Sequence, residues 1–400
     1  MSLLPVDEAV AQLLAGVEPL PAESVQLADA LGRVLAEDVA ARLTQPPFPA
    51  SAMDGYAVRA DEATAGARLK VVGMSRAGVR FLGRLGSGEA VRIFTGAPVP
   101  EGADSILIQE NARRDGSTIE VIVPVAAGRH IRAAGLDFRQ GDTLLQANRP
   151  LSAHQLSLAA SMGHAALPVR RKPRVAILAN GDELVPPGET PGPDQIVSSN
   201  GVGLAALVRQ AGGEAIDLGI APDRREAISA FVDRASGADI LVTSGGASVG
   251  EHDLVQEALK DAGMTLDFWK IAMRPGKPLM VGKLGAMRVL GLPGNPVSTF
   301  VCAELFLKPL VRAMLGLPAA PEMATAKLSV PMAENDGRQD YVRARLSTTD
   351  AGLVATPFEI QDSSMLGTLA AADALIVRPI NAPAAAAGES VPVLLLGRWS

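Results

Sequence analysis

The sequence predicts a multidomain α/β plus β protein, in which a central, mostly parallel α/β domain is combined with β-rich domains. Strand-sized apolar runs alternate with helix-sized runs over residues 173–316, which is typical of a parallel sheet flanked by helices. Short apolar runs separated by Gly, Pro and Asp occupy residues 41–132 and 317–400, which predicts two β domains. The 400 residues with 48% apolar content provide for several cores.

The N-terminal segment has the apolar spacing of two short helices, at residues 6–14 and 23–34. A proline-rich stretch then leads into the small, mainly β domain of residues 41–132. The chain beyond that domain mixes a short strand with a helix-like run. We expect residues 133–172 to return and pack beside residues 1–40, which would make the N-terminal domain discontinuous.

The α/β domain is organised around the glycine-rich segment 243–253, which lies between a strand-like run and an amphipathic helix-like run. Its glycines let the backbone approach a ligand, and free N–H groups at the start of a helix point toward an anion. Glu251 and Asp253 are unusual beside a simple phosphate site, but they fit a hard cation held next to the anion.

Three more polar loops follow strand-like runs, at residues 180–184, 274–278 and 291–298. Ligands of parallel sheets bind outside the carboxyl ends of the strands, so we expect these loops to share one crevice. Asp223 precedes the helix-like run 224–234 and is predicted as its N-cap.

A long apolar run over residues 297–315 predicts a helix that closes the α/β domain. It contains the single cysteine, Cys302, which excludes an internal disulfide and a Cys-rich metal site. Beyond it, five short strand-like runs predict a C-terminal β barrel or sandwich.

The formal charge of −6 and pI of about 5.4 argue against non-specific nucleic-acid binding. The first residues lack the pattern of a signal peptide. No uninterrupted apolar run approaches the length of about 20 residues needed to span a bilayer. We therefore expect a cytoplasmic protein with neither nucleic-acid nor membrane partners.

The carboxylates are the first candidates for chemistry, because Mg²⁺ prefers oxygen ligands together with substrate phosphates. Cationic side chains in the same loops suit anions. Each carboxylate taken alone is also explained by a helix cap or a surface charge, and Asp54 and Thr95 by ordinary turn chemistry. No Walker loop, Gly-x-Ser-x-Gly elbow or paired histidine spacing is present. The residues together predict a magnesium-assisted enzyme acting on a phosphorylated, anionic small molecule.

Six motifs across nearly the whole chain extend this interpretation: they occupy residues 51–57, 95–104, 180–184, 244–253, 274–278 and 291–298. Taken together and in this order, they resemble the molybdopterin molybdenumtransferase (MoeA) family, which is related to the gephyrin E domain. The resemblance implies a molybdopterin-binding, MogA-like α/β domain and an elongated homodimer. It implies that the active cleft forms between the α/β domain of one subunit and the β domain of the other.

The reaction implied by the resemblance is the Mg²⁺-dependent insertion of molybdate into adenylylated molybdopterin, with release of AMP and molybdenum cofactor. The matching positions imply catalytic roles for Asp54, Thr95, Glu183, Asp223 and Asp253, of which the last three would hold Mg²⁺. The positions implied to bind pterin, phosphate or molybdate are Ser244, Gly245, Gly246, Ser248, Lys270, Arg274, Lys277, Pro293, Asn295, Pro296, Ser298, Arg343 and Ser363.

Two other functions are alternatives. A molybdopterin adenylyltransferase would resemble residues 174–316 alone and would not need the motifs around Asp54 and Thr95. A non-catalytic cofactor carrier or scaffold is compatible with the gephyrin relationship, but the complete carboxylate set favours catalysis. For the transferase, we expect the molybdopterin adenylyltransferase and acceptor molybdoenzymes as partners. The choice between molybdenum and tungsten is not encoded at this level.

Overall fold

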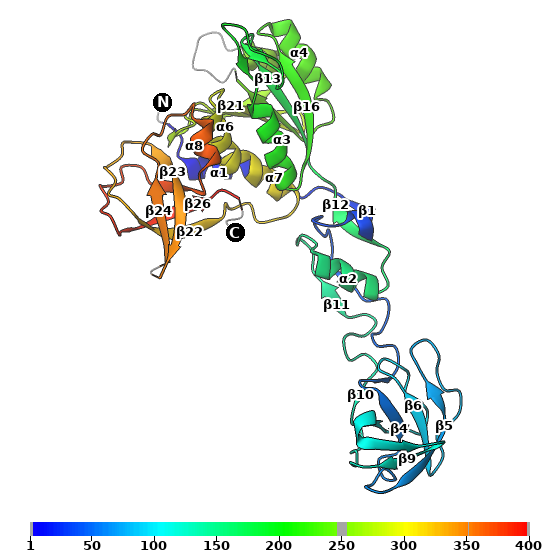
Figure 1. Ribbon diagram of the computed structural model, residues 1–400. Helices are drawn as coiled ribbons and strands as arrows, with labels where there is room; N and C mark the ends of the chain where they lie inside the picture. Colours follow the sequence, from blue (N-terminus) through cyan, green and yellow to red (C-terminus); the bar gives the residue numbers. More distant parts are fainter. Residues whose placement is uncertain (1–2, 246–253, 351, 398–400) are drawn as a thin grey trace. The chain divides into compact units, whose positions relative to one another are not determined.

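The structure is a computed structural model that describes residues 3–245, 254–350 and 352–397. The chain divides into two compact units (Figure 1). The larger unit comprises Met1–Glu23 and Arg170–Ser400, and the smaller unit comprises Ser24–Val169. Each unit buries its own clusters of apolar side chains. Among the described residues, every helix is too short or too polar to span a bilayer.

A six-stranded sheet forms the α/β part of the larger unit. Its strand order is β16-β13-β17-β21-β20-β18. The first four strands pair in parallel, and the last two are added antiparallel. The predicted mostly parallel α/β sheet is thereby confirmed. The strand bounds are β13 (Arg174–Asn180), β16 (Glu214–Ala221), β17 (Ile240–Ser244), β18 (Thr265–Trp269), β20 (Met280–Leu284) and β21 (Met287–Leu292).

Alternating side chains of β13 serve the two faces of this sheet. Ala176 and Leu178 lie in the core that also contains Ile228 of α4 (Arg225–Arg234) and Val255 of α5 (Leu254–Asp261). The other face of β13 packs with α3 (Asn200–Gln210). Because both faces are covered, β13, β17 and β21 are nearly continuous apolar runs, as buried parallel strands require.

The predicted closing helix is one continuous helical segment with a π-helical turn inside it. It consists of α6 (Pro296–Cys302), a π-helical turn at Ala303–Leu307 and α7 (Lys308–Met314). Pro309 follows the π turn; proline has no N–H to donate and its ring clashes with the carbonyl four residues earlier, which widens the helix locally. Helix α1 (Val6–Leu14) packs against α7.

The C-terminal part of the larger unit is a closed five-stranded barrel, which confirms the predicted β barrel. The closed circuit runs β23-β24-β22-β26-β25 and returns to β23. Small and apolar side chains such as Ala344, Ile376 and Val393 fill its interior. The strands are β22 (Met323–Leu328), β23 (Gln339–Thr349), β24 (Gly352–Pro357), β25 (Ala374–Arg378) and β26 (Ser390–Leu395), and helix α8 (Leu366–Ala370) lies between β24 and β25.

The smaller unit contains a second six-stranded sheet, with the order β7-β4-β6-β5-β9-β8. Two clusters of buried side chains flank it, one around Leu69 and Ile119 and the other around Ile93 and Ile106. The predicted mainly β character of this region is confirmed. The strands are β4 (Gly55–Val58), β5 (Arg68–Ser75), β6 (Glu89–Ile93), β7 (Ser105–Ile108), β8 (Ala112–Asp115) and β9 (Thr118–Val121), and a 3-10 turn lies at Gln109–Asn111.

The rest of the smaller unit is built from α2 (Ala153–Ser161) and three short strand pairs. Helix α2 begins at a capping box, in which the side chains of Ser152 and Gln155 each accept a hydrogen bond from the other's backbone N–H. The pairs join β1 (Ala22–Gln26) to β12 (Ala166–Arg170), β2 (Val39–Ala40) to β11 (Thr143–Leu145), and β3 (Ala50–Ser51) to β10 (Ile131–Arg132).

The predicted helix at residues 23–34 is wrong. Its first part is β1, and a 3-10 turn at Leu27–Asp29 follows. Pairing of β1 with β12 satisfies the backbone that a helix would have satisfied internally, so tertiary contacts override the local apolar spacing. Residues 1–23 group with the larger unit, and the exact boundaries of the four predicted domains stay a prediction.

Candidate functional site

The carboxyl ends of the parallel strands bring the predicted loops of the larger unit together. Asn180, the last residue of β13, pairs in register with Ala221 of β16. Its predecessor Ala179 pairs with Ser244 of β17, and Ser244 pairs with Leu292 of β21. Loops that leave paired strands at the same level must lie side by side. We call this group of loop residues the strand-end crevice: Asn180–Glu183, Asp223, Ser244–Gly245 and Pro293–Asn295.

Asp223 is held in the crevice by hydrogen bonds from both sides. Its Oδ1 accepts from Asn180 Nδ2 at 3.2 Å, and its backbone N–H donates to Asp182 Oδ1 at 3.0 Å. The prediction that Asp223 caps α4 is wrong, because the helix begins at Arg225 and has no side-chain cap. The carboxylate is engaged by a neighbouring strand end instead.

The turn after β17 passes very close to the end of β13. Gly245 has φ of +104°, and a Cβ at this position would lie 2.7 Å from the backbone oxygen of Asn180. Only glycine fits such a contact. The predicted residues Gly246, Ser248 and Asp253 lie outside the described residues.

Asn200, the first residue of α3, connects three parts of the crevice and was not predicted. Its Nδ2 donates to Ser244 Oγ at 2.9 Å, to the backbone oxygen of Gly294 at 2.8 Å and to Thr299 Oγ1 at 3.3 Å. The only signal in the sequence is the polar run Ser198-Ser-Asn-Gly before an apolar helix. Such a run indicates an ordinary helix start, so the sequence does not predict the bridging role of Asn200.

Three buried oxygen or hydroxyl groups around the crevice have no hydrogen-bond partner among the described residues. They are Asn180 Oδ1, Asn200 Oδ1 and Thr243 Oγ1. Buried polar atoms are normally paired, and an orphaned acceptor carries a desolvation cost. These atoms are therefore available to a donor or a cation.

The loop after β21 is joined to the C-terminal part of the chain through Ser363. Asn295 Nδ2 donates to Ser363 Oγ at 3.2 Å, and the N–H of Val297 donates to the Ser363 carbonyl at 3.1 Å. Pro296 occupies the first turn of α6, and Ser298 is buried there. Ser363 is thus placed beside the predicted Pro293–Ser298 loop, whereas the adjacent Ser364 bonds to Asp362.

Arg343 is a buried residue that organises the segment carrying Ser363. Its side chain is 1% exposed, its Nε donates to Gln361 Oε1 at 3.0 Å, and one terminal nitrogen donates to the Asp362 carbonyl at 2.8 Å. Burial lowers the pKa of Arg343 below the usual value of arginine. The structure therefore gives Arg343 a positioning role, and the predicted direct contact with an anion stays a prediction.

The predicted cationic loop contains Lys270, Arg274 and Lys277. The two ends of this loop are tied by a hydrogen bond from the N–H of Ile271 to the Lys277 carbonyl at 2.9 Å. The ammonium of Lys270 lies 4.6 Å from the centroid of the Trp269 ring, within the range of a cation–π contact. The roles of Lys270 and Lys277 in binding an anion stay predictions.

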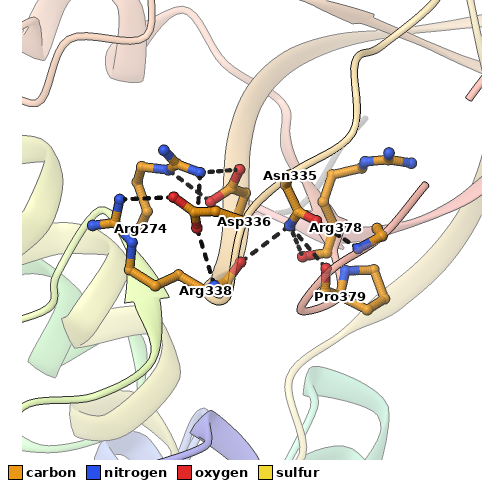
Figure 2. Close-up of polar contacts among 8 residues, drawn as sticks. Arg274, Asn335, Asp336, Arg338, Arg378 and Pro379 are labelled. Carbon is orange, nitrogen blue, oxygen red and sulfur yellow. Dashed lines mark hydrogen bonds and ion pairs between the residues drawn. The ribbon is translucent and has the colours of Figure 1, made fainter. Parts of the chain in front are cut away.

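Arg274 is engaged by carboxylates of the barrel. It makes a two-pronged pair with Asp340, with Nε–Oδ1 at 2.8 Å and a second bond of 2.9 Å to Oδ2. Figure 2 shows it beside Asp336, which lies 3.4 Å away and also pairs with Arg338. The bond to Asp340 raises the pKa of Arg274, and the bond from Arg338 lowers the pKa of Asp336. An incoming anion would have to share this guanidinium with Asp340.

In the smaller unit, the two predicted residues Asp54 and Thr95 are in direct contact. Asp54 Oδ1 accepts from the backbone N–H of Thr95 at 2.8 Å and from its hydroxyl at 2.9 Å. These two bonds, the backbone one first, hold the pKa of Asp54 below its ordinary value. Asp54 is therefore a half-buried carboxylate that stays ionised.

Arg92 supports this pair and was not predicted. Its guanidinium donates to the Gly55 carbonyl at 3.1 Å and to Gln109 Oε1 at 2.8 Å. It also lies 5.1 Å from the Tyr56 ring centroid and 4.8 Å from that of Phe94. An arginine on a strand gives no signal in the sequence that tells whether it makes such contacts or is an ordinary surface charge.

Comparisons with known proteins agree with this arrangement. Three family models match the chain: the MoeA N-terminal region (domain I and II) at residues 4–163, a probable molybdopterin binding domain at residues 176–313, and the MoeA C-terminal region (domain IV) at residues 325–396. A molybdopterin molybdenumtransferase of Haemophilus influenzae is 34% identical over 398 residues, which cover 98% of each chain. The chain belongs to the MoeA family.

Other relatives support the same MoeA assignment. A Nostoc protein also named molybdopterin molybdenumtransferase is 37% identical, over 94% of this chain and 88% of its own. A crystal structure of a MoeA protein of molybdopterin biosynthesis from Pyrococcus horikoshii matches all of both chains with a TM-score of 0.87 and 31% identity. The predicted family and fold class are confirmed, and the chain is assigned to molybdenum cofactor biosynthesis.

Magnesium is implied by the MoeA resemblance, and the oxygen donors of the crevice suit it. Asp223 and the orphaned Asn180 Oδ1 lie together at the ends of adjacent strands, and oxygen ligands are what Mg²⁺ prefers. Within residues 3–245, 254–350 and 352–397, no three His, Cys, Asp or Glu side chains form a metal-binding group. Of the predicted ligands, Glu183 folds back against Gly181, and Asp253 lies outside this part of the chain.

Proposed function

We propose that the chain is a molybdopterin molybdenumtransferase that inserts molybdate into adenylylated molybdopterin in the presence of Mg²⁺ and releases AMP. The observation that carries this proposal is the match, over 98% of the chain, to a relative with that transferase name. The strand-end crevice supports it, because it combines carboxylate and amide oxygens with a tight glycine turn. Cation ligands beside an anion site are what a phosphorylated substrate requires.

The chemistry of the side chains suggests a separate role for each group of site residues. Mg²⁺, when bound, would neutralise charge on the substrate phosphates; Glu183, Asp223 and Asp253 are the proposed ligands, and Asn180 Oδ1 supplies a further oxygen. Ser244, Gly245, Gly246 and Ser248 would orient the phosphate and pterin portions. Lys270, Arg274 and Lys277 would attract the oxyanion, and the loop containing Pro293, Asn295, Pro296 and Ser298 would position it.

Asp54 and Thr95 are proposed to act in the same reaction. Because the bonds from Thr95 keep Asp54 ionised, Asp54 would serve as a fixed negative charge or a proton acceptor. The homodimer, the cytoplasmic location, and the partnership with an adenylyltransferase and with acceptor molybdoenzymes belong to the same proposal and rest on the family resemblance.

Release of AMP from adenylylated molybdopterin tests the proposal directly. The purified full chain is incubated with this substrate in Mg²⁺ buffer, with and without molybdate, and with EDTA as a third arm. The proposal predicts AMP release that needs the protein, molybdate and Mg²⁺, with active cofactor appearing in step. Tight binding without AMP release would favour a cofactor carrier or scaffold, and synthesis of the adenylylated compound from ATP would favour an adenylyltransferase.

A further inference from the structure

A cavity of about 480 Å³ lies on the face of the sheet that packs with α3. It is formed by the ends of β13 and β16, the first turn of α3 and the loop that follows β13. Small-molecule pockets typically measure about 300–1,000 Å³ and are mostly apolar with a few placed polar groups. The cavity has the size for one ring system of a larger ligand.

Apolar side chains make its walls. Ile177 and Ala179 of β13 line it, and they alternate with the core residues of the opposite face. Ile220 comes from β16 and Val202 from the first turn of α3. The loop between β14 (Leu184–Val185) and β15 (Ile196–Val197) contributes prolines, and parallel pairing of these two strands holds it in place.

Two glycines at the cavity keep it open. A Cβ added at Gly201 or at Gly219 would meet no heavy atom within 4 Å, so both positions border open space. Gly219 has φ of +90° and follows a bulge in β16, where Asp217 Oδ1 accepts from the Gly219 N–H at 2.9 Å. Walls of aliphatic side chains with bare backbone between them suit a flat ring.

The charged side chains that line the cavity are both acidic, Asp182 and Asp217. A carboxylate has lone pairs for about four donors, so Asp217 keeps acceptor capacity beside its bond to Gly219. Acceptors of this kind bind exocyclic amine and ring N–H groups, and they repel phosphate. The cavity therefore favours the uncharged, N–H-bearing end of a ligand.

The cavity adjoins the strand-end crevice, because Gly181 and Asp182 belong to both. Asp182 lines the cavity and accepts the N–H of Asp223, whose carboxylate is bonded to Asn180 in the crevice. Pro222, directly before Asp223, also lines the cavity. A ligand with its ring in the cavity would carry its phosphate past Asp223 toward the glycine turn at Gly245.

We propose that this cavity binds the flat, amine-bearing heterocycle of the phosphorylated substrate, with Asp217 and Asp182 accepting from its N–H groups. This inference rests on the proposed function, whose substrate contains two such rings, an adenine and a pterin. Both share a planar fused ring with an exocyclic amine. Titration with each ring separately distinguishes them.

Calorimetric titration of the full chain with adenosine and, separately, with pterin tests the site, because neither probe has a phosphate to bind in the crevice. Val202 is 62% exposed, so V202W fills the cavity mouth without disturbing the core. I196W places the same side chain at a position that is 58% exposed and does not line the cavity. We expect one probe to bind the wild type, V202W to weaken it at least tenfold, and I196W to leave it unchanged.

The carboxylate is tested by D217N, with E214Q on the same strand as its control. Loss of a charge-assisted hydrogen bond predicts about tenfold weaker binding for D217N, and no change for E214Q. The probe that responds identifies the ring as purine or pterin. Absence of binding by both probes at millimolar concentration, or equal affinity in V202W, would overturn the inference.

The outcome is distinguishable from a failure of the proposed function, because titration requires no turnover. If the wild type releases AMP and V202W does so with an unchanged KM, the transferase function stands and the cavity assignment fails. If the wild type releases no AMP but V202W loses probe binding, the cavity assignment stands and the transferase function fails.

Discussion

The two regions that carry predicted catalytic residues differ in what holds their carboxylates: the exposed Asp223 of the crevice is bonded to a buried amide, whereas the half-buried Asp54 is bonded to a nearby loop residue. In the strand-end crevice, Asn180 and Ser244 are 8% and 3% exposed, and side-chain amides connect one loop to the next. In the smaller unit, the half-buried Asp54 carboxylate accepts both of its hydrogen bonds from the single residue Thr95. The crevice is positioned by burial and by many weak bonds, whereas the Asp54 site is positioned by one local contact. Changes to the buried amides of the crevice should therefore cost stability as well as activity, and changes at Asp54 should cost mainly activity.

The largest expected effect is on turnover. D54A and D253A should each reduce molybdate-dependent AMP release by at least about 10²–10³-fold, the range for loss of one preorganised electrostatic contact. Thermal melting of D54A should fall only slightly, because the two bonds from Thr95 are the only side-chain hydrogen bonds of Asp54 that the change removes. D61A, which removes an exposed carboxylate elsewhere in the smaller unit, is the control and should retain activity. A wild-type rate in either variant would remove that residue from the catalytic set.

Second in size is the effect of Asn200 on stability. N200A removes the bonds to Ser244, Gly294 and Thr299, and we expect a loss of about 1–3 kcal/mol in the free energy of unfolding. Urea denaturation measures it. Q210A, at the exposed other end of α3, provides the control on the same helix. If the two variants unfold at the same urea concentration, the crevice is not held by Asn200 and the contrast between the regions is lost.

A smaller effect on stability is expected at Arg274, which lies at the surface of the larger unit. R274K keeps the charge but loses the two-pronged bond to Asp340, and the Arg274 side chain is 44% exposed. Exposed ion pairs contribute less than about 1 kcal/mol, so urea denaturation should show a change below that of N200A. A larger loss than in N200A would mean that the Arg274–Asp340 pair, not the amide bridges, secures this unit.

The smallest expected change is a shift in the titration of Asp54. T95V removes the hydroxyl donor but keeps the backbone N–H, so the pKa of Asp54 should rise part of the way to its ordinary value. A lowered pKa means that the contact stabilises the fold above the ordinary aspartate pKa of about 3.9 and that this contribution is lost as pH falls through the lowered value. In T95V the loss should begin at higher pH.

NMR titration of the Asp54 carboxyl carbon measures this shift directly. T64V, a substitution of another threonine in the smaller unit, is the control. An identical Asp54 titration in wild type and T95V would show that the hydroxyl does not contribute to the local contact.

The crevice was predictable in outline because the sheet topology determines which loops lie together. Once strands alternate with helices, the loops after Asn180, Ser244 and Leu292 must share one edge of the sheet, whatever their side chains are. Asn200 and Arg92 were not predictable, because their roles depend on which distant carbonyls they reach. Local propensity also failed at residues 23–34, where strand pairing replaced the expected helix. The prediction that Asp223 caps α4 failed because its carboxylate accepts a hydrogen bond from Asn180 instead.

The single cysteine, Cys302, can report on movement of the loop between Arg274 and Lys277. Cys302 is fully buried at the end of α6, its thiol lies 3.7 Å from the Gly276 carbonyl, and burial raises its pKa well above the usual range. A neutral, enclosed thiol reacts with neither alkylating reagents nor soft metal ions. Since Gly276 belongs to the loop between Arg274 and Lys277, modification of Cys302 should occur only when that loop lifts from the helix. The rate of thiol labelling would then report how often the cationic loop opens. Substrate binding would slow this labelling.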